Sequence, residues 1–157
     1  MKKLLQAIIL SSAFVSCSEN DQKFNVEETT IGEIQEALIS GQTTCREVVS
    51  KYLLRIETYD KTSGINAITV INPEALAKAD ATDRAIISNE ELPQLFCAPI
   101  VVKDNFDTYD MVTSGGSVIL KNSYPPDDAF MVRKLREAGA IIIAKTNMAE
   151  WAFSPRE

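Results

Sequence analysis

Lys103 is the residue of this sequence whose type and position point most directly to chemistry. It follows the short apolar run at residues 100–102 with no polar step between them. A lysine amine in water has a pKa of about 10.4 and is protonated at neutral pH. Burial disfavours the charged form and lowers that pKa, so a desolvated lysine can accept a proton from a nucleophile. The alternative is an ordinary strand-end lysine whose ammonium reaches water.

Hydroxyl groups near this lysine are candidates for the nucleophile. The glycine-rich turn at 113–117, TSGGS, holds Ser114 and Ser117. The sequence contains no histidine, which excludes Ser-His-Asp and Cys-His catalysis and histidine-ligated metals within this chain. It also lacks a Cys-x-x-Cys pair, which argues against a structural zinc site.

Length and composition predict about one globular domain. The chain has 157 residues, of which 45% are hydrophobic and 24% charged. Its formal net charge of −6 argues against a nucleic-acid partner, which would require a basic surface.

The hydrophobic pattern predicts the elements that must position Lys103. Capping boxes at 30–33 and 44–47 start two helices, and residues 41–43 join them into a hairpin. Strands are predicted at 65–71, 98–102 and 140–144, and helices at 74–86, after 125–128 and at 148–153. Strands alternating with helices indicate an α/β domain with a largely buried sheet. Function in such sheets gathers where strands end, and Lys103 and Lys145 both lie at such ends.

The first residues read as an export signal rather than as part of the fold. Two lysines precede a mostly apolar run at 4–15, which is too short for an ordinary membrane span. Residues 1–16 resemble a bacterial lipoprotein signal, with Cys17 as the lipidation site and 17–26 as a tether. Cleavage without lipid is the alternative. We therefore expect an exported protein, either periplasmic or attached to the membrane through a lipid anchor only.

Two further cysteines, Cys45 and Cys97, leave a choice open. An oxidising compartment could pair them, and the sequence does not show whether they are close in space. Two buried free thiols are the slightly favoured prediction, because cysteine is often buried as a small hydrophobic residue.

A longer stretch, residues 101–154, closely resembles the amidase signature family. The matching features are Lys-Asp-Asn at 103–105, the TSGGS loop at 113–117, Ala-Gly-Ala at 138–140 and Lys-Thr-Asn-Met at 145–148. Their order and spacing carry the resemblance, since none of them is specific alone. Cys-Ala-Pro at 97–99 departs from the more usual glycine-containing approach to the strand.

The resemblance implies a function and a role for each candidate residue. Lys103 would be the base of a Ser-Ser-Lys triad that hydrolyses a small-molecule carboxamide at its C–N bond, without a metal or cofactor. Both catalytic serines would follow in a downstream signature, so Ser114 and Ser117 would belong to a supporting loop. Asp104, Asn105 and Lys145 would be structural.

Residues 27–157 would then be the N-terminal part of an amidase domain, with a mixed sheet covered by helices and incomplete in this chain. Such a chain would be inactive alone, and marginally stable because the strand at 140–144 would lack neighbours. A non-catalytic remnant or binding module is the main alternative. The glutaminase subunit of the tRNA amidotransferase is less favoured, because that work is intracellular and the export signal speaks against it.

Overall fold

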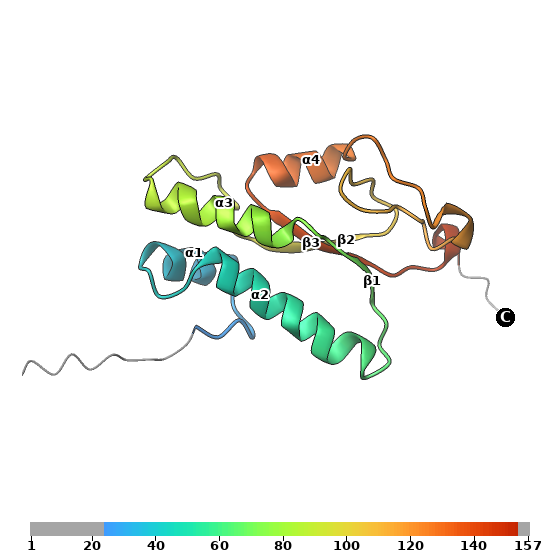
Figure 1. Ribbon diagram of the computed structural model, residues 1–157, viewed down its shortest axis with the longest axis horizontal. Coiled ribbons are helices and arrows are strands. Elements are labelled where there is room, and N and C mark those ends of the chain that lie inside the picture. The colour runs from blue at the N-terminus through green and yellow to red at the C-terminus, as the bar shows by residue number, and fades with distance from the viewer. Residues whose placement is uncertain (1–23, 154–157) are drawn as a thin grey trace, which may run out of the picture.

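The computed structural model describes residues 24–153, which form a three-stranded mixed sheet with helices on both faces (Figure 1). The predicted α/β class is confirmed. In chain order the helices and strands are α1 (Ile31–Ile39), α2 (Cys45–Ile56), β1 (Ile68–Ile71), α3 (Ala75–Ile87), β2 (Pro99–Lys103), α4 (Phe130–Glu137) and β3 (Ile141–Thr146). A π-helical turn, Glu57–Lys61, extends α2, and 3₁₀ turns lie at Val118–Leu120 and Glu150–Ala152.

Both predicted capping boxes are present. The Thr30 hydroxyl accepts from the backbone N–H of Glu33, and the Glu33 carboxylate accepts from the backbone N–H of Thr30. Thr44 and Glu47 form the same reciprocal pair at the start of α2. Each box satisfies N–H groups that have no partner inside their own helix, which fixes where the two helices begin.

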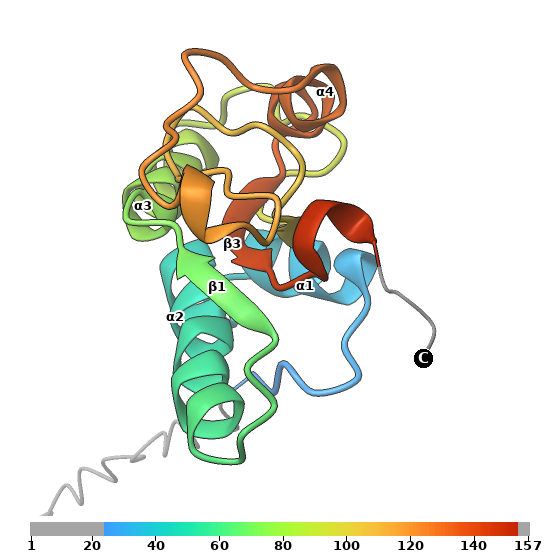
Figure 2. The same ribbon diagram turned by 90° about the vertical axis from the view of Figure 1, so that its right-hand side faces the viewer.

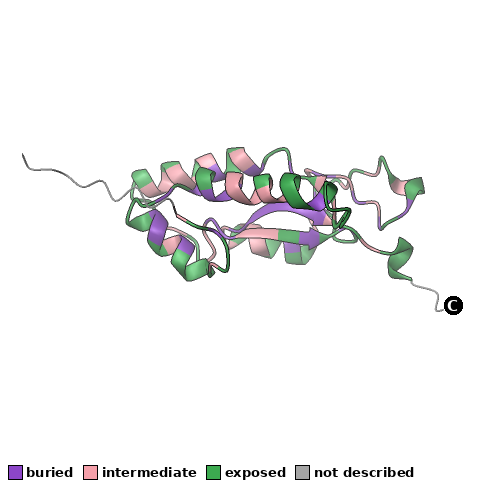
Figure 3. Cartoon of the chain, turned by 90° about the horizontal axis from the view of Figure 1, so that it is seen from below, coloured by how far each residue is buried: buried purple, intermediate pink, exposed green. Residues whose placement is uncertain are grey.

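Strand β3 lies in the middle of the sheet, in the order β1-β3-β2. It runs parallel to β2 and antiparallel to β1. The expectation that the AIIIA strand lacks neighbours is therefore wrong, since β1 and β2 are the edges. All of the first five residues of β3 are buried, because the strand has a neighbour on each side and helices over each face (Figure 3).

The two faces of the sheet are covered by different helices (Figure 2). Ile141 and Ile143 pack in one hydrophobic cluster with residues of α1, α2 and α3. Ile142 packs in the other cluster with Val102 of β2 and Val132 of α4. Side chains of a strand alternate between faces, so β3 contributes to both cores.

A buried ion cluster joins α4 to the loops beside it. The charged residues around Arg136 favour an outward-facing side chain at this position, but the Arg136 side chain is only 16% exposed. Its guanidinium donates to both oxygens of Asp110 at 2.8 Å and lies 3.0 Å from Asp128. Asn72 donates to the same Asp110 carboxylate at 2.9 Å. Asp110 and Asp128, both outside α4, pair with the guanidinium and allow it to be buried.

The N-terminal end of the described chain packs onto α2. The Phe24 carbonyl accepts from Lys51, and the Val26 carbonyl accepts from the Tyr52 hydroxyl at 3.1 Å. Val26 is buried in the core, so the predicted tether at 17–26 overlaps the fold at its last residues. The predicted signal at 1–16 and Cys17 lie outside the described residues. Among the helices within 24–153, none is long and apolar enough to cross a membrane.

Cys45 and Cys97 form a disulfide, which corrects the slightly favoured prediction of two free thiols. Their Cα atoms are 5.7 Å apart, within the range that a disulfide spans. Packing of α2 against the segment before β2 brings together residues that are 52 positions apart. That proximity follows from tertiary structure, which the sequence spacing alone does not show.

Candidate active site

The two strand-end lysines lie side by side at one end of the sheet. In the parallel register of β2 and β3, Lys103 pairs with Thr146 and Lys145 pairs with Val102. Parallel strands place their carboxyl ends at the same edge, so the loops that follow both strands meet there. The structure thus brings Lys103, Asp104, Lys145 and the loop at 113–117 together, as the strand-end argument predicts.

Lys145 is completely buried, with no exposed surface. Its ammonium donates to the Val112 carbonyl at 3.0 Å and to the Thr113 hydroxyl, and lies 3.6 Å from an oxygen of Asp104. Burial lowers the pKa of Lys145, and the nearby Asp104 carboxylate opposes that shift. With two acceptors and a counter-ion, this lysine is held in one place, a geometry that agrees with its predicted structural role.

Asp104, the residue after Lys103, joins the strand end to the glycine-rich loop. Its carboxylate, 1% exposed, accepts from the backbone N–H of Ser114 at 3.1 Å and from the Ser114 hydroxyl. Its own backbone N–H donates to Thr146 at 3.1 Å, which continues the β2–β3 ladder one residue past Lys103. Asp104 therefore fixes the backbone on the far side of Lys103, in agreement with its predicted structural role.

The loop at 113–117 is pressed against the chain that leaves β3. Gly116 has a φ of +75°, and a Cβ at this position would lie 2.8 Å from the Met148 carbonyl oxygen. The Ser117 hydroxyl, in a residue that is 2% exposed, donates to Glu150 at 2.6 Å. The Trp151 N–H donates to the Gly115 carbonyl at 2.9 Å. These contacts make the loop a rigid support beside the strand ends.

Lys103 itself is exposed within residues 24–153, so this part of the chain does not by itself supply the desolvation that a lysine base requires. Val102 turns into the hydrophobic core, so the next side chain along the strand points to the opposite face. Strand β2 is an edge strand and has β3 as its one neighbour, which leaves that face open around the lysine. The apolar run before Lys103 therefore does not bury it among the described residues.

The backbone on both sides of Lys103 is nevertheless fixed. Val102 and Lys103 are paired in the ladder, and Asp104 is anchored by its backbone and its carboxylate. The Lys103 carbonyl accepts from the Phe106 N–H at 2.9 Å, which closes the following turn. Asn105, in that turn, is exposed, and no hydrogen bond joins its side chain to the described residues. Its predicted structural role in the turn thus gains no support.

Sequence reasoning missed the role of Thr113. Its hydroxyl accepts from Lys145 and donates to the Phe106 carbonyl at 3.3 Å. It thereby bridges the central strand and the turn after β2. The signal in the sequence is only that a buried lysine requires acceptors, and it does not say which of several nearby hydroxyls supplies one.

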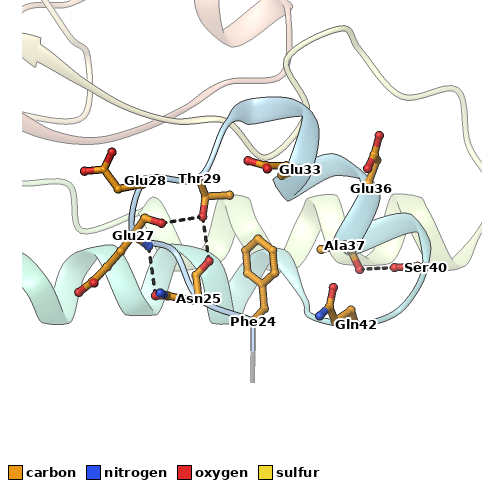
Figure 4. Close-up of a pocket in the computed structure, with 10 residues that line it drawn as sticks. All are labelled: Phe24, Asn25, Glu27, Glu28, Thr29, Glu33, Glu36, Ala37, Ser40 and Gln42. Carbon is orange, nitrogen blue, oxygen red and sulfur yellow. Dashed lines mark hydrogen bonds between the residues drawn. The ribbon is translucent and has the colours of Figure 1, made fainter. Parts of the chain in front are cut away.

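A separate hollow lies beside α1 and contains four glutamates (Figure 4). Thr30 hydrogen bonds lower the pKa of one of them, Glu33, which caps the helix. Within residues 24–153, no group of three or more histidine, cysteine, aspartate or glutamate residues is arranged to hold a metal ion. The hollow is lined by residues 24–42 and has no part in the lysine site.

Comparison with known proteins agrees with this geometry. The family model described as Amidase matches residues 47–156. The chain belongs to the amidase signature family. A glutamyl-tRNA(Gln) amidotransferase chain of Alkaliphilus metalliredigens is 42% identical over 129 residues, covering 82% of this chain and 26% of that protein. A probable amidase of Arabidopsis thaliana is 34% identical over 152 residues, covering 95% of this chain and 29% of that protein.

Solved amidase structures show the same fold. The native peptide amidase of Stenotrophomonas maltophilia superposes with a TM-score of 0.76 and 36% identity, over 80% of this chain and 26% of that one. An amidase family protein of Bacillus anthracis superposes with a TM-score of 0.75 and 37% sequence identity, over 80% of this chain and 25% of that one. The chain thus spans about a quarter of the length of these relatives. The predicted amidase signature fold is confirmed for the part of the domain it spans.

Proposed function

We propose that the protein carrying this chain hydrolyses a carboxamide C–N bond, with Lys103 as the general base. The observation that carries the proposal is the placement of Lys103 at a strand end between two fixed neighbours, within a chain of the amidase family. A catalytic base must be held in a defined position, and the surrounding ladder and turn supply that. We assign Ser114 and Ser117 to the supporting loop, where their hydroxyls donate to the Asp104 and Glu150 carboxylates.

The proposed reaction follows the Ser-Ser-Lys scheme that the family resemblance implies. Neutral Lys103 takes a proton, relayed by a bridging serine, as the nucleophilic serine attacks the amide carbon. The C–N bond breaks, and the proton returns to the leaving nitrogen, which departs as ammonia or an amine. Water then releases the acid from the acyl-serine by the same proton route. Both serines would come from the part of the family domain that follows the segment matched by this chain.

The exposure of Lys103 in residues 24–153 bears directly on this scheme. An exposed lysine at neutral pH is mostly protonated and cannot act as a base. The proposal therefore requires that the remainder of the amidase domain cover β2 and desolvate the amine. An alternative in which this chain is a non-catalytic binding module requires no such covering and no turnover.

The experiment uses protein expressed from the complete reading frame that contains this chain. Turnover is measured on a peptide amide, an aryl anilide and glutamine, with ammonia or amine release as the readout. Lys103→Ala should lose about 10²- to 10⁴-fold in turnover, the usual contribution of a general base. Lys134→Ala, an exposed lysine on α4, is the matched control and should retain full activity. Equal activity of the two variants would remove Lys103 from the mechanism.

The same panel tests a second candidate function. Several curated relatives are chains of a glutamyl-tRNA(Gln) amidotransferase, with up to 43% identity among those compared. Glutamine hydrolysis without peptide amide or anilide hydrolysis would favour a glutaminase that supplies ammonia. Hydrolysis of the peptide amide or anilide favours the independent amidase. Absence of turnover on a wider range of amides would support the binding-module alternative.

A further inference from the structure

The Cys45–Cys97 disulfide lies at a junction of the fold that the proposed amidase chemistry does not use. Cys45 is the first residue of α2, and Cys97 lies in the segment that leads into β2. Both cysteines have no exposed surface. The bond encloses a segment that contains α2, β1 and α3. It therefore ties the helical layer to the strand that carries Lys103.

Independent contacts hold each of the two cysteines in place. On the α2 side, the Asp83 carboxylate accepts from the backbone N–H groups of Cys45 and Arg46, at 2.6 and 3.0 Å. On the β2 side, the Leu95 N–H donates to the Ala138 carbonyl at 2.7 Å. The segment before β2 also contacts α1, where Gln35 donates to the Gln94 carbonyl at 3.0 Å. The native fold itself thus brings the two cysteines together.

Cys97 has an unfavourable backbone conformation, which the disulfide helps to stabilise. Its φ is +58°, in the left-handed region that disfavours residues with a Cβ. The segment around it leaves little room to relax, because the Gly139 turn packs on it. A Cβ at Gly139 would lie 3.0 Å from Phe96 and from Pro93. A cysteine in this conformation is strained, and the bond to Cys45 together with burial in the core holds it there.

We propose that Cys45 and Cys97 are oxidised during folding, in an oxidising compartment, by a thiol–disulfide exchange catalyst. A disulfide of that catalyst accepts two electrons and two protons from the two thiols, and one disulfide forms in this chain as the other is reduced. Because both cysteines are fully buried in the fold, an oxidant reaches them only while α2 is not yet docked. The catalyst therefore acts on the unfolded or partly folded chain.

The compartment follows from two observations that do not depend on each other. Disulfides persist in secreted and periplasmic proteins and are rare where glutathione keeps thiols reduced. The sequence of residues 1–16 independently has the pattern of an export signal. Together they assign folding of this chain to the far side of a membrane, whatever amide it acts on.

The test compares two versions of the complete reading frame in a bacterium with an oxidising envelope, one intact and one lacking residues 2–16. Cells are quenched in acid, free thiols are alkylated, and a non-reducing peptide mass map shows whether the Cys45 and Cys97 peptides are joined. We expect joined peptides in the envelope fraction of the intact protein and alkylated thiols in the shortened one. Free thiols in the envelope fraction, retention of the intact protein in the cytoplasm, or joined peptides in both versions would overturn the proposal.

A refolding experiment tests the order of events. The reduced, denatured chain carrying Cys17→Ser is refolded with oxidised glutathione or with a reductant only. The oxidised product should melt about 10 °C above the reduced one, since closing a loop of this length restricts the unfolded chain. A Cys45→Ser/Cys97→Ser variant should match the reduced product in both conditions. Rapid oxidation of chain that has already folded would contradict pairing of the thiols before they are buried, and equal melting temperatures would contradict a stabilising disulfide.

Discussion

The carboxyl ends of β2 and β3 are neighbours in one sheet, yet the lysines at these ends differ completely in burial. Lys145 is fully buried among two acceptors and a carboxylate, whereas Lys103 is exposed. Both lysines follow apolar runs, so the run before a lysine does not decide its burial. Burial alternates along β2, where Lys103 points away from the buried side of Val102, whereas the first five residues of β3 are buried on both faces of the sheet. In this chain the buried lysine is structural, and the exposed one is the candidate for catalysis.

The largest effect that would sharpen this comparison is on stability. Lys145→Met should lower the free energy of unfolding by about 3–5 kcal/mol, because it leaves the buried Asp104 carboxylate without its counter-ion. Lys103→Met, a matched change at the exposed lysine, should stay within about 0.5 kcal/mol of the unmodified chain. Urea unfolding followed by circular dichroism measures both. Similar losses for the two variants would contradict the assignment of different roles.

A second, smaller effect tests the loop that both strand ends share. Gly116→Ala adds a Cβ that would lie 2.8 Å from the Met148 carbonyl oxygen, at a φ of +75°. Gly64→Ala is its control, because Gly64 has a φ of +77° and nothing within 4 Å of the added Cβ. The control should lose about 1–2 kcal/mol for the left-handed backbone alone. Gly116→Ala should lose about 1–3 kcal/mol more through the clash.

The same urea experiment decides that prediction. If the two glycine variants are equally stable, the loop at 113–117 is not pressed against residues 148–149 in solution. The support that we assign to the strand ends would then have to come from Asp104 and Thr113 alone.

The smallest effect expected is a change of stability with pH. Burial lowers the pKa of Lys145 in the folded chain below its unfolded value of about 10.5. Between the folded and unfolded pKa values the unfolded chain binds more protons, so the free energy of unfolding rises with pH across that window. Measured against Lys145→Met at each pH, the unmodified chain should gain stability as pH rises from the lowered folded pKa of Lys145 toward 10.5. If the unmodified chain instead loses stability relative to Lys145→Met as pH rises, the Asp104 carboxylate raises the pKa of Lys145 by more than burial lowers it.

Much of the fold could be predicted from the sequence because local signals were strong. Thr30 and Thr44 each stand three residues before a glutamate, and both helices begin there. The apolar run at 140–144 gave the position of β3 to within two residues. Gly139 follows directly on the cap of α4 with a φ of +90°, the position and conformation at which glycine commonly ends a helix.

What failed depended on contacts between distant residues. The apolar residues before Lys103 leave both a buried and an exposed side chain open, because the pairing of β2 in the sheet sets which way that side chain points. Cys45 and Cys97 are brought together by packing, and Arg136 is drawn inward by Asp110 and Asp128. The hydrogen bonds between Asp104 and Ser114 join residues ten positions apart, and no repeating sequence pattern predicts them.

Turnover of Lys103→Arg in the complete reading frame is the most direct test of the central claim. Arginine keeps the length and the charge of the side chain but does not release its proton in proteins. If Lys103 is the base, this variant should unfold at the same urea concentration as the unmodified protein and should lose at least about 100-fold in turnover. Turnover near that of the unmodified protein, with stability unchanged, would show that the exposed lysine has no part in the chemistry.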